Sequence, residues 1–381
     1  MTKFRKGYLI CLLFFWLFAN IAYSQIDEII GVHISADYPP PPSGEPTFTY
    51  IYAGGVGSAL AKVRLSDLTT VSTVSLSHAV YMGDVDLVNR KILLAGSQVE
   101  YFSVVDIDTM TVDREIDLGP LFPYDFWIRS IIVDPYNSGI CFIAAYWKSG
   151  PLTPRGFVAK VNYLTGNLIA YQTLVSGTTI AFQLGEYYNG WIDSNYVYFA
   201  DNNNPPLIWR ISKSNLANYN YISTNEPNQQ GVTSFKSQEL SLNLIYAMLM
   251  SRYGYYNTID RIDTSTFTKT GQLNLTSGIN LDIGWLYVDT DNRYLYGWTR
   301  YIYLNKMYMF KIDLVTFTLL LNVETPDLGG TARHVGLFDK TRNRIYASHQ
   351  GGFKIYSPSD LSKISDGWTS TVGTITFMWN D

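Results

Sequence analysis

Short apolar runs alternate with polar turns along most of this chain, and no stretch has the period of an amphipathic helix. The clearest stretch is 286–321, where apolar runs end in Val288-Asp289 and in Ile312-Asp313. Runs rich in Tyr, Ile, Val and Thr and bounded by Asp or Asn are typical of β-strands. An Asp side chain accepts hydrogen bonds from backbone N–H groups two residues on, so it favours a turn. The pattern predicts an all-β protein in which residues 286–321 form one four-stranded sheet.

Weaker copies of this unit recur along nearly the whole chain. Residues 261–267 (RIDTSTF) are followed fifty positions later by residues 311–317 (KIDLVTF), and Asp289 recurs at the same step as Asp339. A period of about forty to fifty residues indicates a repeat architecture, because one unit alone cannot bury its apolar face. The chain is therefore expected to stack several similar sheets.

Seven such units can be traced from residue 50 onwards. Four-stranded units in this number match the β-propeller, in which four to eight blades surround a central channel. The sequence predicts an all-β, seven-bladed β-propeller, and six blades plus a degenerate segment is the alternative. It leaves the closure of the ring open, because a strand expected at 29–34 either opens the first blade or completes the last one.

The repeated phrase Val-Asp, then Ile-Tyr-Ala, then Lys-Ile-Asp-Leu-x-Thr-Phe resembles the repeats of the NHL and YVTN-type propeller superfamily. The resemblance covers about residues 50–381 and is closest over 240–356. It implies a propeller fold. Related propellers include binding and surface proteins, and also lyases, lactonases and quinone-cofactor dehydrogenases, so the resemblance does not imply one activity.

The first 24 residues have the pattern of a secretory signal peptide. A basic start is followed by an apolar run over 8–18, which is short for a membrane span, and by Ala22-Tyr23-Ser24. Cleavage before Gln25 would leave residues 25–381 as a single propeller domain. We therefore expect a secreted protein, extracellular or periplasmic, without stable membrane insertion after cleavage. Cys141 would then be the one remaining cysteine, and its apolar neighbours predict a buried, unreactive thiol.

Composition narrows the range of partners. The chain has 28 Lys and Arg against 32 Asp and Glu, for a net charge of −4, and no basic stripe, so nucleic acid is not an expected partner. The 30 tyrosines are interpreted as strand residues whose rings pack in the sheets, with a sugar- or protein-binding face as the alternative. Asn274 begins a glycosylation sequon, which matters if the host is a eukaryote.

The sequence carries no Gly-x-Ser-x-Gly, Walker, His-Glu-x-x-His or EF-hand motif, and it has four histidines. One weaker constellation comes from the repeat. The first strand of each propeller blade lines the channel, so residues at matched distances before the Val-Asp pair lie around its mouth. Counting back along the strands predicts that four charged residues converge at one end of the channel: Arg129, Glu186, Asp282 and His334.

Glu186, Asp282 and His334 offer oxygen and nitrogen ligands for a divalent cation, and the set with Arg129 offers a base and an anion clamp. The alternative is a solvated rim with exposed ion pairs. No cofactor beyond such a cation is indicated. The leading hypothesis is a secreted binding or surface-scaffold module whose partner is an extracellular protein or glycan. The alternative is an enzyme of the propeller lyase, lactonase or quinone-dehydrogenase type at the channel mouth, and the sequence leaves open whether the protein is an enzyme.

Overall fold

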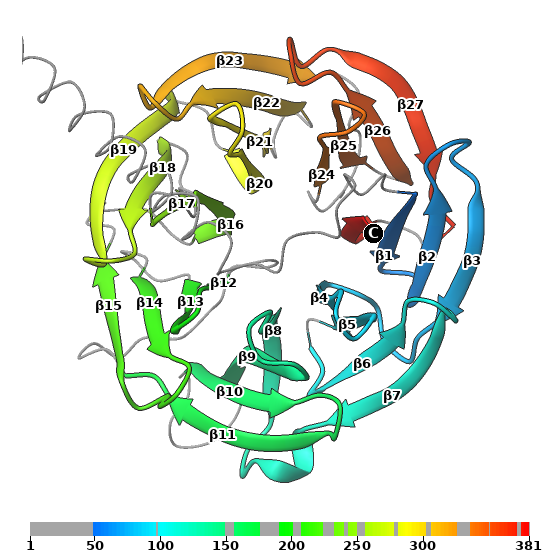
Figure 1. Cartoon of the computed structure of the whole chain (residues 1–381), viewed down its shortest axis with the longest axis vertical. Coiled ribbons are helices and arrows are strands. Elements are labelled where there is room, and N and C mark those ends of the chain that lie inside the picture. Colours follow the sequence, from blue (N-terminus) through cyan, green and yellow to red (C-terminus); the bar gives the residue numbers. More distant parts are fainter. Residues whose placement is uncertain are drawn as a thin grey trace, which may run out of the picture. The chain divides into compact units, whose positions relative to one another are not determined.

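Seven four-stranded antiparallel sheets stand in a ring (Figure 1). The computed structural model describes residues 49–96, 98–148, 156–175, 190–200, 207–223, 232–239, 243–249, 256–277, 281–301, 306–325, 336–349, 351–371 and 375–380. The fold is an all-β, seven-bladed β-propeller, as the repeats predict, and the six-bladed alternative is wrong. Within the described residues, no helix is long and apolar enough to cross a bilayer.

The blades are numbered along the chain, with each strand order given from the centre of the ring outwards. The first four blades are built from these strands: blade 1 from β28 (Ile375–Asn380), β1 (Tyr50–Gly55), β2 (Ala59–Arg64) and β3 (Thr70–Ser75); blade 2 from β4 (Met82–Asp86), β5 (Lys91–Ala95), β6 (Tyr101–Asp106) and β7 (Thr111–Asp117); blade 3 from β8 (Phe126–Val133), β9 (Ile140–Trp147), β10 (Gly156–Asn162) and β11 (Asn167–Thr173); blade 4 from β12 (Gly190–Ile192), β13 (Tyr196–Ala200), β14 (Leu207–Ser212) and β15 (Tyr219–Ser223).

The last three blades follow the same plan: blade 5 from β16 (Val232–Glu239), β17 (Leu244–Leu249), β18 (Tyr256–Asp263) and β19 (Thr268–Ser277); blade 6 from β20 (Leu281–Asp289), β21 (Tyr294–Tyr301), β22 (Lys306–Asp313) and β23 (Thr318–Thr325); blade 7 from β24 (Gly336–Asp339), β25 (Arg344–His349), β26 (Gly352–Tyr356) and β27 (Lys363–Thr369). A short 3-10 helix, η1 (Gly119–Leu121), lies between blades 2 and 3.

The C-terminal strand closes the ring. β28 pairs antiparallel with β1, with Ile51 opposite Asn380 and Gly55 opposite Ile375, so the two ends of the propeller sequence share blade 1. The innermost strands contact one another in a full circle from β4 through β8, β12, β16, β20 and β24 to β28 and back to β4. The strand expected at 29–34 and the predicted signal peptide over 1–24 lie outside the described residues.

Burial falls from the inside of each blade to the outside. In blade 2, four of the five residues of β5 are buried, whereas β7 has one buried residue. In blade 6, the outermost strand β23 alternates between exposed and half-buried positions, as expected for a sheet edge with one face towards water. The inner strands are therefore covered on both faces and can be stable only between neighbouring blades.

Seven apolar clusters of described residues fill the seven seams between adjacent blades. Each cluster combines side chains from the facing sheets of two blades, and a buried aliphatic or aromatic side chain contributes about 1.5–3 kcal/mol to the burial free energy. The seams are represented by these pairs: Leu60 and Ile92, Phe102 and Phe126, Phe142 and Phe199, Ile208 and Ile245, Ile259 and Leu295, Trp298 and Phe338, and Phe353 and Ile51.

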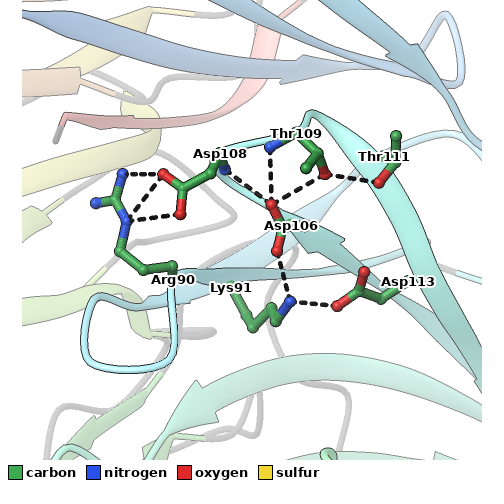
Figure 2. Close-up of polar contacts among 7 residues, drawn as sticks. All are labelled: Arg90, Lys91, Asp106, Asp108, Thr109, Thr111 and Asp113. Carbon is green, nitrogen blue, oxygen red and sulfur yellow. Dashed lines mark hydrogen bonds and ion pairs between the residues drawn. The ribbon is translucent and has the colours of Figure 1, made fainter.

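The Asp-x-x-Thr phrase of the repeat closes the hairpin between the third and fourth strands of a blade. In blade 2, the Asp106 carboxylate accepts hydrogen bonds from the backbone N–H groups of Asp108 (2.9 Å) and Thr109 (2.8 Å) (Figure 2). The Thr109 hydroxyl bonds the same carboxylate and lies 2.8 Å from the hydroxyl of Thr111. Asp263 and the turn that follows it repeat this arrangement in blade 5. The Asp-x-x-Thr motif therefore has a structural role, because it stabilises this turn.

Ion pairs add to this turn in blade 2. Lys91 donates to Asp106 at 2.7 Å and also to Asp113, and Arg90 donates to Asp108 at 2.7 Å (Figure 2). The hydrogen bond from Lys91, assisted by the Thr109 backbone, holds the pKa of the Asp106 carboxyl well below its usual range. Because these groups lie near the surface, the ion pairs themselves contribute little to stability, about 0–1 kcal/mol each.

The same turns place one non-glycine residue in the left-handed region, where a side chain is strained. Phe267 and Phe317 have φ values of 53° and 52°, and Gly166 takes the equivalent place in blade 3. The phenylalanine rings lie under arginines of the preceding blade: the guanidinium carbon of Arg210 is 4.5 Å from the Phe267 ring centroid, and that of Arg261 is 4.9 Å from the Phe317 centroid. The contact with an arginine of the preceding blade thus favours phenylalanine here, although a left-handed backbone disfavours any residue with a Cβ.

The basic residue that opens the Lys-Ile-Asp phrase links its blade to the next one. Its side chain donates to a backbone carbonyl in the next blade. The three such bonds described are Lys160 to the Lys213 carbonyl (3.0 Å), Arg210 to that of Thr264 (3.0 Å) and Lys311 to that of Pro358 (3.4 Å). The basic residue at this position therefore stabilises the contact between adjacent blades.

A buried ion pair joins blades 3 and 4. The Lys213 amine donates to the Asp134 carboxylate at 2.8 Å and to the Asp193 carbonyl at 2.9 Å, and it lies 4.5 Å from the Tyr136 ring centroid. The Lys213 and Asp134 side chains are 5% and 0% exposed. Burial lowers the pKa of the lysine, and its hydrogen bond to Asp134 opposes that shift. Removing one partner would leave an uncompensated buried charge.

We predict that Gly336→Ala destabilises the propeller. Gly336 begins the innermost strand of blade 7, and a Cβ there would lie 1.6 Å from the Cη2 atom of Trp298, which is fully buried in blade 6. Overpacking of this kind costs about 1–3 kcal/mol in the free energy of unfolding measured with urea. Gly271→Ala is the matched control, because its Cβ would meet neighbours at 3.4 Å; it should change that free energy by less than about 1 kcal/mol.

Lys213→Met should lower the free energy of unfolding by about 3–5 kcal/mol, because Asp134 would lose its charge partner inside the protein. Urea titration of this variant and of the double variant Asp134→Asn/Lys213→Met measures the effect. The double variant should recover part of the loss, since neither charge remains. A single variant as stable as the wild type would show that the pair does not hold the seam.

Candidate functional site

The two faces of the ring have different connections. The turn face carries the short hairpins between first and second strands and between third and fourth strands, such as 87–90 and 107–110. The loop face carries the connections between second and third strands and those between blades, such as 56–58 and 118–125. The Asp-capped turns and the hydrogen bonds between blades lie on the turn face, which leaves the loop face as the place for a ligand site.

Two of the four residues predicted to converge are placed on innermost strands. Arg129 lies in β8 of blade 3, and Asp282 lies in β20 of blade 6, with its side chain outside the described part. β8 contacts β4 and β12, whereas β20 contacts β16 and β24, so these two strands are not neighbours in the ring. Glu186 and His334 lie outside the described residues. Convergence of the four, and the cation site of Glu186, Asp282 and His334, remain predictions.

β-bulges interrupt the loop-face ends of these inner strands. The pairing of β8 with β9 shifts between Ile128 and Ser130, so Arg129 is the extra residue, and the pairing of β20 with β21 shifts between Asp282 and Gly284. A bulge turns a side chain away from the regular alternation and is common beside functional sites. In blade 3, Trp127 and Arg129 lie on the same side of the sheet by the regular alternation of the strand, and the bulge shifts the alternation of the residues that follow Arg129.

Arg129 lies beside a pair of aromatic rings, Trp127 and Tyr146, whose centroids are 5.3 Å apart in an edge-to-face contact. Its guanidinium carbon is 5.3 Å from the Trp127 ring centroid and 4.8 Å from that of Tyr146, and its Nη2 donates a 2.9 Å hydrogen bond to the Tyr146 hydroxyl. The amine of Lys148, just past the end of β9, is 5.8 Å from the Trp127 centroid. These four residues, Trp127, Arg129, Tyr146 and Lys148, are called the arginine–aromatic site below.

The positive charge of this site is not matched by a protein carboxylate. Among the described residues, no Asp or Glu forms an ion pair with Arg129 or Lys148, and the buried Nε of Arg129 has no acceptor. Arg129 is half-buried and Lys148 is exposed. A guanidinium keeps its charge in proteins, and a buried N–H without an acceptor costs about 1–3 kcal/mol. The site can therefore accept an anion.

The sequence pointed to Arg129 but missed Tyr146 and Lys148. Tyr146 reaches the site because β9 pairs antiparallel with β8, which places it directly opposite Trp127. The available signal was the aromatic end of the second strand, Tyr146-Trp147-Lys148, next to a first strand that also carries Trp and Arg. The sequence does not give the register of β8 against β9, so it could not predict that Tyr146 and Lys148 lie next to Arg129.

A Ser, His and Glu set in blade 2 is not arranged for nucleophilic catalysis. His78 Nε2 lies 3.0 Å from the Ser103 hydroxyl, but its Nδ1 faces the Ala79 carbonyl at 3.1 Å, and Glu115 approaches the serine at 3.4 Å. Ser103 is 0% exposed and His78 is 5% exposed, so no substrate reaches the hydroxyl. The set is a buried hydrogen-bond network beside the Tyr101 ring.

The remaining sequence-predicted positions are placed as follows. Cys141 is buried in β9, as expected for an unreactive thiol, and burial raises its pKa. Asn274 is exposed on β19, the outermost strand of blade 5, and its glycosylation remains a prediction. Tyr198, Tyr246, Tyr296 and Tyr346, from the Ile-Tyr-Ala phrase and its variants, are buried in second strands. Within the described residues, no group of three His, Cys, Asp or Glu side chains is placed to hold a metal.

No protein-family model matches this chain, and no curated protein matches it. Among solved structures, the chain is similar to one described as a functionally unknown protein from Desulfotomaculum acetoxidans DSM 771. The two share 8% sequence identity with a TM-score of 0.58, over 87% of this chain and 98% of the other. At this identity, the similarity concerns the fold alone.

We predict a pH effect from His78. Burial lowers its pKa below the value of 6.5 that applies when the chain is unfolded. The unfolded chain therefore takes up the proton first, and the free energy of unfolding should fall as the pH is lowered from about 7.5 to 5.5. In His78→Gln, which keeps a polar group next to Ser103, urea titrations should show a smaller fall over the same range. An equal fall in both proteins would assign the effect to other groups.

Proposed function

We propose that this chain is a secreted propeller of the NHL/YVTN type that acts as a binding or surface-scaffold module outside the cytoplasm. The observation that carries the proposal is the arginine–aromatic site, where two cations and two aromatic rings lie at the loop-face end of an inner strand without a carboxylate partner among the described residues. The N-terminal signal pattern supports export, and the expected partner is an extracellular protein or glycan.

A binding role also agrees with how the fold divides its two faces. The turn face holds the Asp-capped hairpins and the bonds between blades, which must be retained for stability. The connections on the loop face differ in length between blades, and loops on a rigid scaffold are where binding residues usually lie. The Asp, Thr and Lys of the repeat are used in the turns and seams, so the repeat motif itself supplies no catalytic group.

The test is retention of the purified protein on arrays of immobilised glycans and extracellular proteins, with product analysis of the bound material. We expect retention without turnover. Lys148→Glu, on the loop face, should weaken it at least about tenfold, which corresponds to about 1.4 kcal/mol. Lys340→Glu is the matched control, because Lys340 is an exposed turn-face lysine paired with Asp291. Conversion of the bound material to product would favour an enzyme, and equal loss in both variants would argue against a loop-face site.

A further inference from the structure

We propose that the arginine–aromatic site binds the carboxylate of an acidic glycan, a sugar chain that contains uronic acid. This inference rests on the proposed binding function and specifies the ligand of the same site. It depends on three features of blade 3: a bulged arginine, two aromatic rings that hold it, and a second cation beside them.

The charge of the ligand follows from what Arg129 lacks. One of its nitrogens, Nη2, donates to the Tyr146 hydroxyl, whereas its buried Nε has no acceptor in the described part of the chain. A guanidinium has five N–H donors and pairs best with a planar carboxylate through two parallel hydrogen bonds. A half-buried arginine without a counter-charge is costly by itself. A bound carboxylate would supply the missing charge.

The rings indicate what carries the carboxylate. Trp127 is half-buried, so part of its indole stays open beside the guanidinium, and the apolar C–H face of a sugar ring can pack on such a surface. Tyr146 is 9% exposed and mainly orients Arg129. An acidic pyranose offers an apolar face and a carboxylate on one rigid ring, whereas a Glu or Asp side chain offers the carboxylate on a flexible stem.

The overall charge argues for a single carboxylate and against a polyanion. The chain has a net charge of −4, so it does not attract nucleic acids or heavily sulfated chains over long distances. Lys148 is exposed at the rim and adds local positive charge next to Trp127. The site thus provides one bidentate partner and one supporting cation, which suits one uronate residue of a longer glycan.

The experiment is a calorimetric titration of the purified protein at low ionic strength with a galacturonic acid trisaccharide, with the neutral galactose trisaccharide as the paired probe. The acidic probe should bind at least tenfold more tightly than the neutral one. Arg129→Met should abolish this preference, and Arg129→Lys should keep part of it, because a lysine retains the charge without the planar pair of donors. Trp127→Leu should weaken binding of the acidic probe.

A second readout separates binding from a structural role. Met retains the apolar stem of Arg129 and removes an unmatched charge, so the melting temperature of Arg129→Met should equal or exceed that of the wild type. If this variant does not fold, Lys148→Met, at an exposed position, provides the test, and it should lower the affinity for the acidic probe at least threefold.

Equal affinity for the two trisaccharides would overturn the proposal, as would unchanged binding by Arg129→Met. Binding of a triglutamate peptide with no binding of the uronate probe would show that the site takes an acidic peptide and would overturn the glycan. Failure of the titration, with retention on the arrays still sensitive to Lys148→Glu, would reject the carboxylate and keep the binding module. Failure of both would reject the proposed function as well.

Discussion

The pairing of β28 with β1 is the interaction on which the rest of the propeller depends. Each blade has inner strands that are apolar on both faces, so every blade needs a neighbour on each side. The C-terminal strand places Met378 in the cluster that Ile51 of blade 1 and Phe353 of blade 7 share, and this fills the last of the seven seams. Without that strand, blade 1 would lose its innermost member, and the ring would end in two uncovered sheets.

The seams between blades explain features that look unfavourable within one blade. Phe267 takes a left-handed backbone conformation in its turn, yet its ring packs under Arg210 of the preceding blade. Lys213 and Asp134 are charged and buried, yet each neutralises the other across a seam. These contacts lie towards the turn face and join residues far apart in the sequence. The turn face thus carries these polar and charged links between blades, in addition to the apolar seams.

The arginine–aromatic site depends on the same division. A regular strand would alternate its side chains, but the bulge at Arg129 adds one residue to β8 and changes the direction of those that follow. The rigid inner strand presents a cation beside the rings of Trp127 and Tyr146. Because the pairing with β9 fixes both rings, the guanidinium is held in place before any ligand binds, which reduces the entropy cost of binding.

The sequence by itself determined the repeat, the propeller class and the turns, and it favoured seven blades over six. A turn such as that at Asp106 depends on hydrogen bonds between residues two or three positions apart. A short stretch of sequence therefore predicts it, and the same stretch recurs with the repeat. Only the tertiary structure decided how the ring closes, which charges pair across seams, and that Tyr146 and Lys148 join Arg129. Those outcomes depend on the register of strand pairs and the packing of whole sheets, and neither is encoded in a short window of residues.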